Sequence, residues 1–272
     1  MTTNQLIDAI GIQHKVYPKG ARIVSVVPSI TELLFDLGLE ANVVGRTGFC
    51  FHPRDKIREV PKIGGTKDFN LEALRNLRPT HLIVNVDENP QNLVEAAKEF
   101  VPNVLVTHPM RPEDNVELYR FIGTIFNRRA WAKDLEERFL RELDVAKRSC
   151  AEFQIEKILY VIWKKPWMTI SPDTYIARVL QAVGFDHIDI GSESRYPEFK
   201  LTEWANRVDR ILLSSEPYAF RPRDIIEVKD AVSDKTNVAV SIIDGEMTSW
   251  YGSRAIEGFK YLNCYRHELA GK

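Results

Sequence analysis

The feature that most constrains the fold is the stretch 129–153 near the middle of the chain, which contains neither glycine nor proline. Apolar residues recur in it at three- and four-residue spacing, and charged residues fill the opposite positions; the apolar residues are Ala132, Leu135, Phe139, Leu143 and Ala146. This pattern is typical of an amphipathic helix. At 1.5 Å per residue the helix would be roughly 35 Å long. We interpret it as a backbone helix that joins two lobes.

Strand-like and helix-like segments alternate on both sides of this helix. Before it, the pattern predicts strands at 22–27, 41–45, 81–86 and 103–107 and helices at 30–37, 70–77, 89–100 and 114–126. After it, the pattern predicts strands at 157–163, 210–214 and 237–243 and helices at 173–183, 201–207 and 223–232. Alternation at this spacing is typical of βα units and parallel sheets.

The sequence therefore predicts an α/β fold with two βα lobes that contain parallel-type sheets, an N-terminal lobe at 1–128 and a C-terminal lobe at 154–272. The helix 129–153 would connect them, and a small ligand would bind in the cleft between the lobes. Ser29 is expected to cap the helix 30–37, with Glu32 three residues later completing a capping box.

Composition and charge limit the classes of partner that the protein can bind. A chain of 272 residues, 44% of them hydrophobic, can bury a full core. A formal charge of -1 argues against nucleic acid as a partner. No segment approaches the roughly 20 apolar residues of a membrane helix, so we do not expect an integral membrane protein. Small molecules and proteins remain as partners.

Location and redox state follow from the first residues and the cysteines. The segment 1–20 lacks the apolar run of a secretion signal, which predicts a cytoplasmic protein as the chain is written. A periplasmic location is the alternative if a signal was removed. The three cysteines, Cys50, Cys150 and Cys264, are far apart and odd in number, which favours reduced thiols.

Several motifs resemble one known family over nearly the whole chain after residue 20. They are RIVSVVPSITELLFDLGL at 22–39, VPKIGGT at 60–66, NLEAL at 70–74, YVIW at 160–163, SSEPY at 214–218 and IDGE at 243–246. The family is that of the helical-backbone metal receptors, the class III substrate-binding proteins of ABC importers for cobalamin, haem and iron siderophores. FCFHP at 49–53, IWKKP at 162–166 and GEMTSWYGSR at 245–254 make the chain most similar to a branch without a signal peptide that resembles the cobalamin-binding members.

The resemblance implies a transport protein that binds a metal chelate, with no cofactor required. The bound ligand would be a corrinoid such as vitamin B12 or, alternatively, haem or a ferric siderophore. It also implies an ABC permease as a partner, with Glu72 and Glu203 at the places where family members dock. Each of these glutamates also lies in the first turn of a predicted helix, where the helix dipole stabilises a carboxylate whatever its function.

Aromatic residues in the loops after predicted strands are the main candidates for ligand contacts. A corrin or porphyrin presents a wide flat face that aromatic rings can cover. Loops at the carboxyl ends of parallel strands are where such folds bind ligands. The candidates are Phe49, Phe51, Trp163, Trp167, Trp250 and Tyr251. The alternative is that these rings belong to the lobe cores.

Polar candidates accompany these rings. Cys50 and His52 are two residues apart, so on an extended segment they point the same way and can form a half-site for a metal or supply an axial ligand. The alternative is a buried thiol and an ordinary loop histidine. Arg254 can bind a propionate, phosphate or carbonyl, or else pair with Glu216 or Glu246. Lys164 and Lys165 are expected in a solvated rim.

Catalytic signatures are missing from the sequence. It contains no nucleophile elbow, Walker loop, dinucleotide fingerprint or zinc-hydrolase motif, so we expect a binding protein rather than an enzyme. Two alternatives stay open. One is a cytoplasmic enzyme or metallochaperone that processes a metal chelate through Cys50 and His52, and the other is a siderophore or haem receptor.

Overall fold

The computed structural model describes residues 6–232 and 238–271. The chain divides into two compact units that interleave in sequence. Unit 1 comprises Met1–Pro109, Glu113–Phe139 and Tyr251–Arg254, and unit 2 comprises Met110–Pro112, Leu140–Trp250 and Ala255–Lys272. Each unit is described by itself below.

Unit 1 is built on a sheet of four parallel strands in the order β2-β1-β3-β4. The strands are β1 (Ile23–Ser25), β2 (Val43–Arg46), β3 (His81–Asn85) and β4 (Asn103–Thr107). Every residue of β1 and β3 is buried, as expected for inner strands of a parallel sheet.

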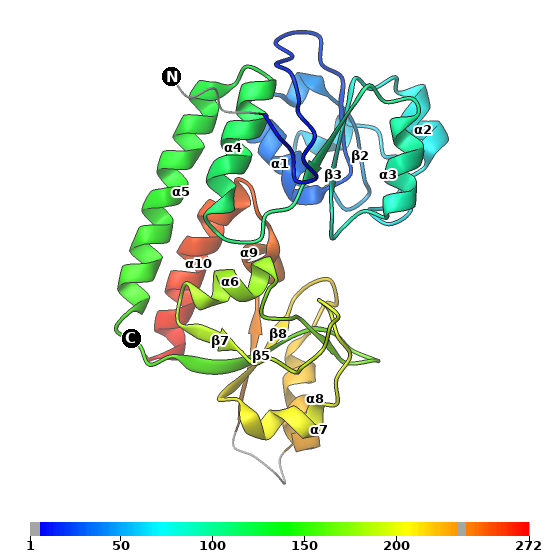
Figure 1. The fold of residues 1–272 in the computed structure, drawn as a ribbon. Helices are drawn as coiled ribbons and strands as arrows, with labels where there is room; N and C mark the ends of the chain where they lie inside the picture. The colour runs from blue at the N-terminus through cyan, green and yellow to red at the C-terminus, as the bar shows by residue number, and fades with distance from the viewer. Residues whose placement is uncertain (1–5, 233–237, 272) are drawn as a thin grey trace. The chain divides into compact units, whose positions relative to one another are not determined.

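The helices of unit 1 cover both faces of this sheet (Figure 1). They are α1 (Pro28–Asp36), α2 (Leu71–Asn76), α3 (Gln91–Lys98) and α4 (Asp114–Ile125), with the short turns η1 (Glu40–Asn42) and η2 (Ile57–Glu59). Residues of α2 and α3 share one hydrophobic cluster with the strands, which includes Leu74, Leu82, Val84 and Val94. Asn70 caps α2, since its side chain accepts a hydrogen bond from the Ala73 N–H at 2.8 Å.

Unit 2 contains a second sheet, with the order β6-β5-β8-β9 and β7 also paired to β5. Its strands are β5 (Glu156–Trp163), β6 (Met168–Thr169), β7 (Phe185–His187), β8 (Arg210–Ser214) and β9 (Ala239–Ile243). All pairings are parallel except that of the short β6. The carboxyl ends of β5, β8 and β9 therefore lie along the same edge of the sheet.

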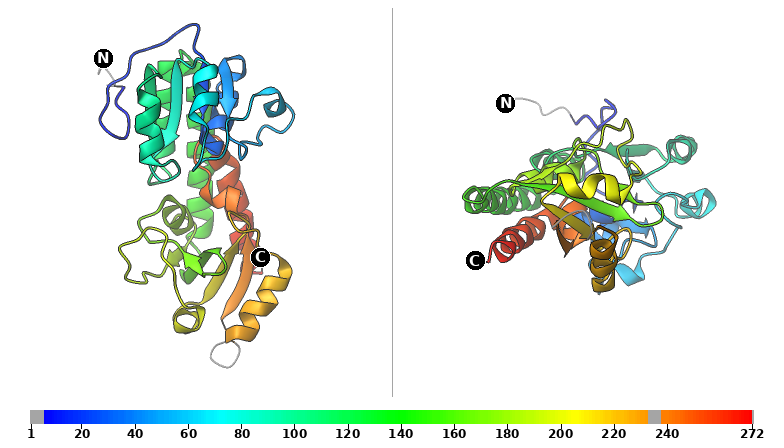
Figure 2. Two further views of the ribbon diagram at one scale, coloured as in Figure 1. Left: turned by 90° about the vertical axis from the view of Figure 1, so that its right-hand side faces the viewer. Right: turned by 90° about the horizontal axis from the view of Figure 1, so that it is seen from below.

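The helical segments of unit 2 are α6 (Tyr175–Gln181), α7 (Leu201–Trp204), η3 (Ala205–Arg207), α8 (Pro222–Val232), α9 (Gly245–Ser249) and α10 (Arg254–Leu269). Helix α8 lies beside β9 (Figure 2). A separate hydrophobic cluster holds this unit together and includes Leu159, Ile211, Val228 and Val240. The two sheets thus have their own cores.

The predicted backbone helix is α5 (Arg129–Cys150), which is shorter than the predicted 129–153 by three residues at its end. All five apolar positions of the sequence pattern are buried. Phe139 packs against Tyr119 of α4 in unit 1, with ring centroids 6.0 Å apart. The unit boundary follows Phe139, so the same helix continues into unit 2.

The sequence prediction failed at the first helix and at two short elements of unit 2. Helix α1 begins at Pro28, with Val27 at the N-cap and no side-chain cap, so the capping box of Ser29 and Glu32 is wrong. Proline is well suited to the first helical position because its φ is already fixed near the helical value. Helix α9 and the three-residue strand β7 were not predicted. The predicted strand 237–243 starts at a residue outside the described ranges, and β9 begins at Ala239.

Candidate functional site

The loop after β2 carries the first group of predicted site residues. Phe49 and Phe51 are 59% and 37% exposed, whereas Cys50 between them is fully buried. The Cys50 Sγ accepts a hydrogen bond from the Thr31 hydroxyl at 3.1 Å and lies 3.2 Å from the Thr47 hydroxyl. Burial raises the pKa of the Cys50 thiol, which favours the neutral form over the thiolate that metals prefer.

His52 lies next to Phe51 and is not buried with Cys50. It is half-buried, and its ring centroid is 5.0 Å from that of Phe51. Across 6–232 and 238–271, no group of three or more His, Cys, Asp or Glu residues is arranged to hold a metal ion. Metal coordination by Cys50 and His52 stays a prediction, and Cys50 would take part only if this loop opened.

A second group lies in unit 1, where the loop after β3 contacts the segment Tyr251–Arg254. The buried Tyr251 hydroxyl donates a hydrogen bond to the Glu88 Oε1 at 2.6 Å. Burial raises the pKa of Glu88 to about 7, and the hydrogen bond from Tyr251 opposes this rise. The Glu88 carboxyl therefore changes charge near neutral pH.

Arg254 completes this group with a fork of two hydrogen bonds to Glu32 of α1. The Arg254 Nε and Nη2 are 2.9 and 2.5 Å from the two carboxylate oxygens. The backbone of Gly252 is held on both sides, because its N–H donates to Asn115 at 2.6 Å and its carbonyl accepts from Tyr119 at 2.8 Å. The segment 251–254 is thus fixed in unit 1 by side chains of α1 and α4 and of the loop after β3.

An aromatic cluster lies at the carboxyl ends of β5 and β8 in unit 2. Trp163 is 39% exposed and contacts Tyr218 edge to face, with ring centroids 5.6 Å apart. Trp167 stacks parallel to Phe220 at 6.1 Å, and Tyr218 and Phe220 also touch. The structure therefore brings Trp163 and Trp167 into one cluster, with Trp163 exposed and Trp167 packed against the core.

Trp250 belongs to a different environment in unit 2. It is 9% exposed, and its indole N–H donates to the Glu216 Oε1 at 2.7 Å. The Ser249 hydroxyl donates to the same oxygen at 3.2 Å. Burial raises the pKa of Glu216 to about 7, and the nearby Glu246 and Asp244 add to the rise. Trp250 thus holds a carboxyl group that also changes charge near neutral pH.

The prediction of a solvated rim is wrong for Lys164. Its side chain is only 9% exposed, and its ammonium lies 2.7 Å from Asp224 and 2.6 Å from Glu227. Although burial opposes ionisation of Asp224, the hydrogen bond from Lys164 holds the pKa of that carboxyl below its ordinary value. The partners come from α8, sixty residues further along the chain, so no local pattern could have indicated the pair.

Sequence reasoning named Glu216 only as a possible partner of Arg254 and did not name Glu88, although the position of each carries a signal. Glu88 follows a buried strand in the polar run 87–89, and Glu216 lies in the SSEPY motif directly after β8. Polar residues at the carboxyl ends of parallel strands are frequent site residues. Glu32 left no such signal, because its position in the first helix suggested a cap instead.

The predicted docking residues are both on the surface. Glu72 is exposed in the first turn of α2 of unit 1. Glu203 is exposed in the first turn of α7 of unit 2 and pairs with Lys200 at 3.1 Å. Each lies in the first turn of a helix that comes before a strand of its own unit, β3 for Glu72 and β8 for Glu203, and their role in docking stays a prediction.

Comparison with known proteins decides the family. The family model described as "Periplasmic binding protein" matches residues 23–234, more than two thirds of the chain. The chain belongs to the periplasmic binding protein family. This confirms the resemblance inferred from the motifs, since class III substrate-binding proteins share this fold.

Similar proteins agree with this assignment. A vitamin B12-binding protein of Photorhabdus laumondii subsp. laumondii is 22% identical over 206 residues, which cover 74% of this chain and 73% of the relative. The periplasmic vitamin B12 binding protein BtuF of Vibrio cholerae has a TM-score of 0.76 at 17% identity, covering 93% of this chain and 98% of that chain. The haem-binding protein RhuT of Roseiflexus sp. RS-1 has a TM-score of 0.78 at 16% identity, covering 93% and 100%.

These comparisons confirm the predicted fold class of two βα lobes with parallel-type sheets and a long connecting helix. They also show that the relatives of this chain are substrate-binding proteins rather than enzymes. No helix in the described ranges is long and apolar enough to cross a membrane. The expectation of a cytoplasmic protein finds no support in a family of periplasmic proteins.

Proposed function

We propose that this binding protein holds a corrinoid or a related metal chelate, such as haem or a ferric siderophore, for an ABC importer. A corrinoid is the first choice because the curated relative and one of the similar structures are both named as vitamin B12-binding proteins. Haem is the next choice, since other proteins of this fold are named for haem. No catalytic step is part of the proposal.

The observation that supports the proposal most directly is the exposure of aromatic rings at or just after the carboxyl ends of strands in both units. Phe49 and Phe51 lie in the loop after β2, and Trp163 is the last residue of β5. Large aromatic side chains are usually buried, and exposed ones grouped on loops are a mark of a binding surface. Their flat faces suit a tetrapyrrole-like macrocycle, which offers a large apolar surface and few hydrogen bonds.

The remaining predicted contacts have a supporting part in this proposal. Trp167, Trp250, Tyr251 and Arg254 are buried or already bound to protein partners. We assign them to holding the loops after β3 and β8 and the segment 250–254 in place. Residues held in this way restrict loop motion before the ligand binds, which lowers the entropy cost of binding.

The test is an absorbance and calorimetric titration with aquocobalamin, cobinamide, haem and a ferric hydroxamate. The Trp163→Ala variant should bind the preferred chelate more weakly by about 1–2 kcal/mol, because an aromatic contact with the ligand is lost. Trp131→Ala is the matched control, since Trp131 is 55% exposed but lies on α5 rather than on a strand-end loop. Equal affinities for wild type and Trp163→Ala would remove Trp163 from the site, and failure of all four chelates to bind would overturn the proposed function.

The same titration in Cys50→Ala tests the metallochaperone alternative. Because the Cys50 thiol is buried and its pKa is raised, we expect the absorbance change on binding to be the same with and without it. A band shift that is lost in this variant would instead identify Cys50 as an axial ligand.

A permease partner and a periplasmic location complete the proposal. Glu72 and Glu203 are exposed carboxylates, one on each unit, and resemble the docking glutamates of importer members. Fractionation of the source cells with an antibody against the protein tests the location. Recovery with the periplasmic or cell-envelope fraction is expected, and recovery only with the cytosol would contradict it.

A further inference from the structure

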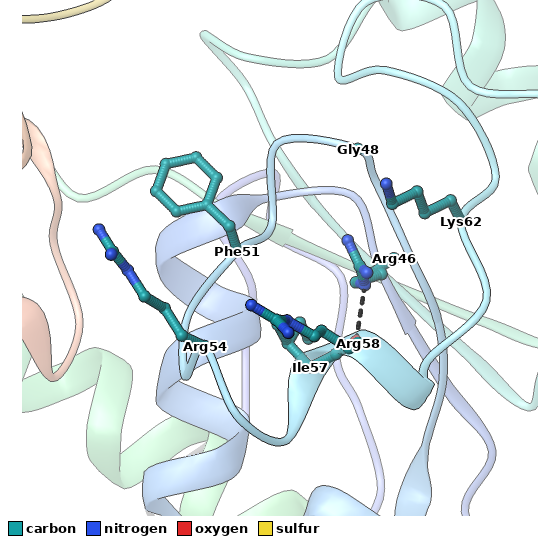
Figure 3. Close-up of a pocket in the computed structure, with 7 residues that line it drawn as sticks. All are labelled: Arg46, Gly48, Phe51, Arg54, Ile57, Arg58 and Lys62. Atoms are coloured by element: carbon teal, nitrogen blue, oxygen red, sulfur yellow. Dashed lines mark hydrogen bonds between the residues drawn. The ribbon is translucent and has the colours of Figure 1, made fainter.

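The loop after β2 also encloses a pocket whose charged lining the proposed chelate contacts do not explain. The pocket has a volume of about 380 Å³ and is lined by Arg46, Gly48, Phe51, Arg54, Ile57, Arg58 and Lys62 (Figure 3). Volumes in this range are typical of small-molecule sites. Four of the seven lining residues are cationic, so the charge of the walls decides what the pocket can hold.

Arg46 is the buried part of this pocket. It is 4% exposed, and its Nε and Nη1 donate hydrogen bonds to four backbone carbonyls, those of Thr47, Cys50, Ile57 and Val60, at 2.8 to 3.2 Å. These bonds fix the guanidinium and fold the loop around it, but carbonyl groups do not neutralise its charge. Buried charges in proteins are normally paired with an opposite charge.

The other three cations have exposed side chains. Arg54 lies in the loop after β2, Arg58 in η2 and Lys62 in the segment after η2. Among the described residues, no carboxylate is within 4.0 Å of the charged nitrogens of Arg46, Arg54, Arg58 or Lys62, in contrast to Lys56 of the same loop, which pairs with Glu40 at 3.6 Å. No acidic residue lines the pocket. Like charges placed around one cavity repel one another, and an anion bound among them would relieve this repulsion.

We propose that this pocket binds a multivalent oxyanion, either a phosphate-type or a polycarboxylate group, with Arg46 at its base and Arg54, Arg58 and Lys62 around it. Guanidinium groups bind such oxyanions through paired, charge-assisted hydrogen bonds. The anion can be free in solution or can be a substituent of the bound chelate. The site itself does not depend on which chelate the protein takes, since the anion is recognised by its charge and oxygen atoms.

The experiment is a calorimetric titration of the full chain with inorganic diphosphate, and separately with citrate, at low ionic strength. The test variant is Arg58→Gln with Lys62→Gln, because both side chains are exposed and their loss leaves the Arg46 hydrogen bonds intact. We expect at least a tenfold loss of affinity, which equals about 1.4 kcal/mol. Added sodium chloride should weaken binding to the wild type, since salt screens exposed charges.

Lys56→Gln is the matched control, because it removes one cation from the same loop but outside the pocket lining. We expect its affinity to stay within about twofold of the wild type, a change of less than 0.5 kcal/mol. The proposal is overturned if the wild type binds neither anion at concentrations on the order of 1 mM. It is also overturned if Lys56→Gln loses as much affinity as the double variant, since binding would then reflect net charge alone.

A second titration identifies the source of the anion once binding is shown. Diphosphate is titrated into protein saturated with aquocobalamin or haem, whichever binds. Competition would show that the pocket receives an anionic group of the chelate, and independent binding would show that the free anion is its ligand. Failure of both chelates to bind would leave the diphosphate result standing, so the two proposals can fail separately.

Discussion

At the scale of single residues, the half-buried carboxyl group of Glu216 couples stability to pH. Its pKa is raised from 4.5 to about 7 by burial first and then by Glu246 and Asp244, so the folded protein holds this proton more tightly than the unfolded chain. The free energy of unfolding therefore falls as the pH rises from about 4.5 through 7. The neutral form is the one that the folded structure favours.

Replacement of Glu216 by Gln should reverse this effect. Gln keeps an oxygen that can accept from Trp250 but cannot ionise, so we expect the variant to unfold with a free energy about 1–3 kcal/mol higher than the wild type at pH 8 and nearly equal at pH 5. Urea denaturation at both pH values measures the difference. The control is Glu257→Gln on the surface of α10, which should show no such pH dependence. A difference of the same size at pH 5 and pH 8 would contradict the assignment.

The site residues that the sequence revealed are those whose signal is local. Phe49 and Phe51 come within a few residues of the end of β2 and Trp163 ends β5, so their place at the carboxyl ends of strands could be predicted. The carboxylate partners could not, because the Tyr251–Glu88 bond joins residues 163 positions apart. A buried Cys50 thiol was predicted only as an alternative to a metal ligand, since the two threonine hydroxyls around its sulfur come from a helix and a loop.

At the scale of elements, the contact of α9 with α10 depends on a glycine. A Cβ atom on Gly258 of α10 would lie 2.5 Å from the Met247 carbonyl oxygen of α9. No side-chain rotation relieves this contact, because the atom belongs to the backbone. Gly258 is therefore retained in a helix interior although alanine has the higher helix propensity.

We expect Gly258→Ala to lower the free energy of unfolding by about 1–2 kcal/mol, because the steric cost exceeds the propensity gain of about 1 kcal/mol. Glu257→Ala, at the neighbouring exposed position, should stay within about 0.5 kcal/mol of the wild type, since it loses only a surface ion pair with Lys260. Chemical denaturation of both variants measures this. A stabilised Gly258→Ala would show that α9 moves away without cost.

At the scale of the whole molecule, the proposed permease contact uses one carboxylate from each unit. The double variant Glu72→Lys with Glu203→Lys should bind the chelate as the wild type does but reduce uptake by cells at least tenfold, a loss of about 1.4 kcal/mol or more in docking. The matched control is Glu95→Lys with Glu257→Lys, which changes one exposed glutamate of each unit in the same way. Equal uptake by both double variants would remove the two glutamates from the docking surface.

The architecture was predictable because its signals repeat along the chain. The alternation of strands and helices and the apolar stripe of α5 each extend over many residues, so single errors do not change the result. Short elements gave weaker signals, and β7 with three residues and α9 with five were missed. The end of α5 was misplaced by three residues because the helical pattern of charges and apolar residues continues past Cys150.

The interleaved units have a practical consequence for anyone who wishes to cut the protein into parts. The segment Tyr251–Arg254 belongs to unit 1 although it follows Trp250 of unit 2 directly in sequence. A fragment that stops at Phe139 would lack Gly252, whose backbone forms hydrogen bonds with Asn115 and Tyr119. It would also lack Arg254, which donates two hydrogen bonds to Glu32. Neither unit is one continuous segment of the chain, so no single cut separates the two units.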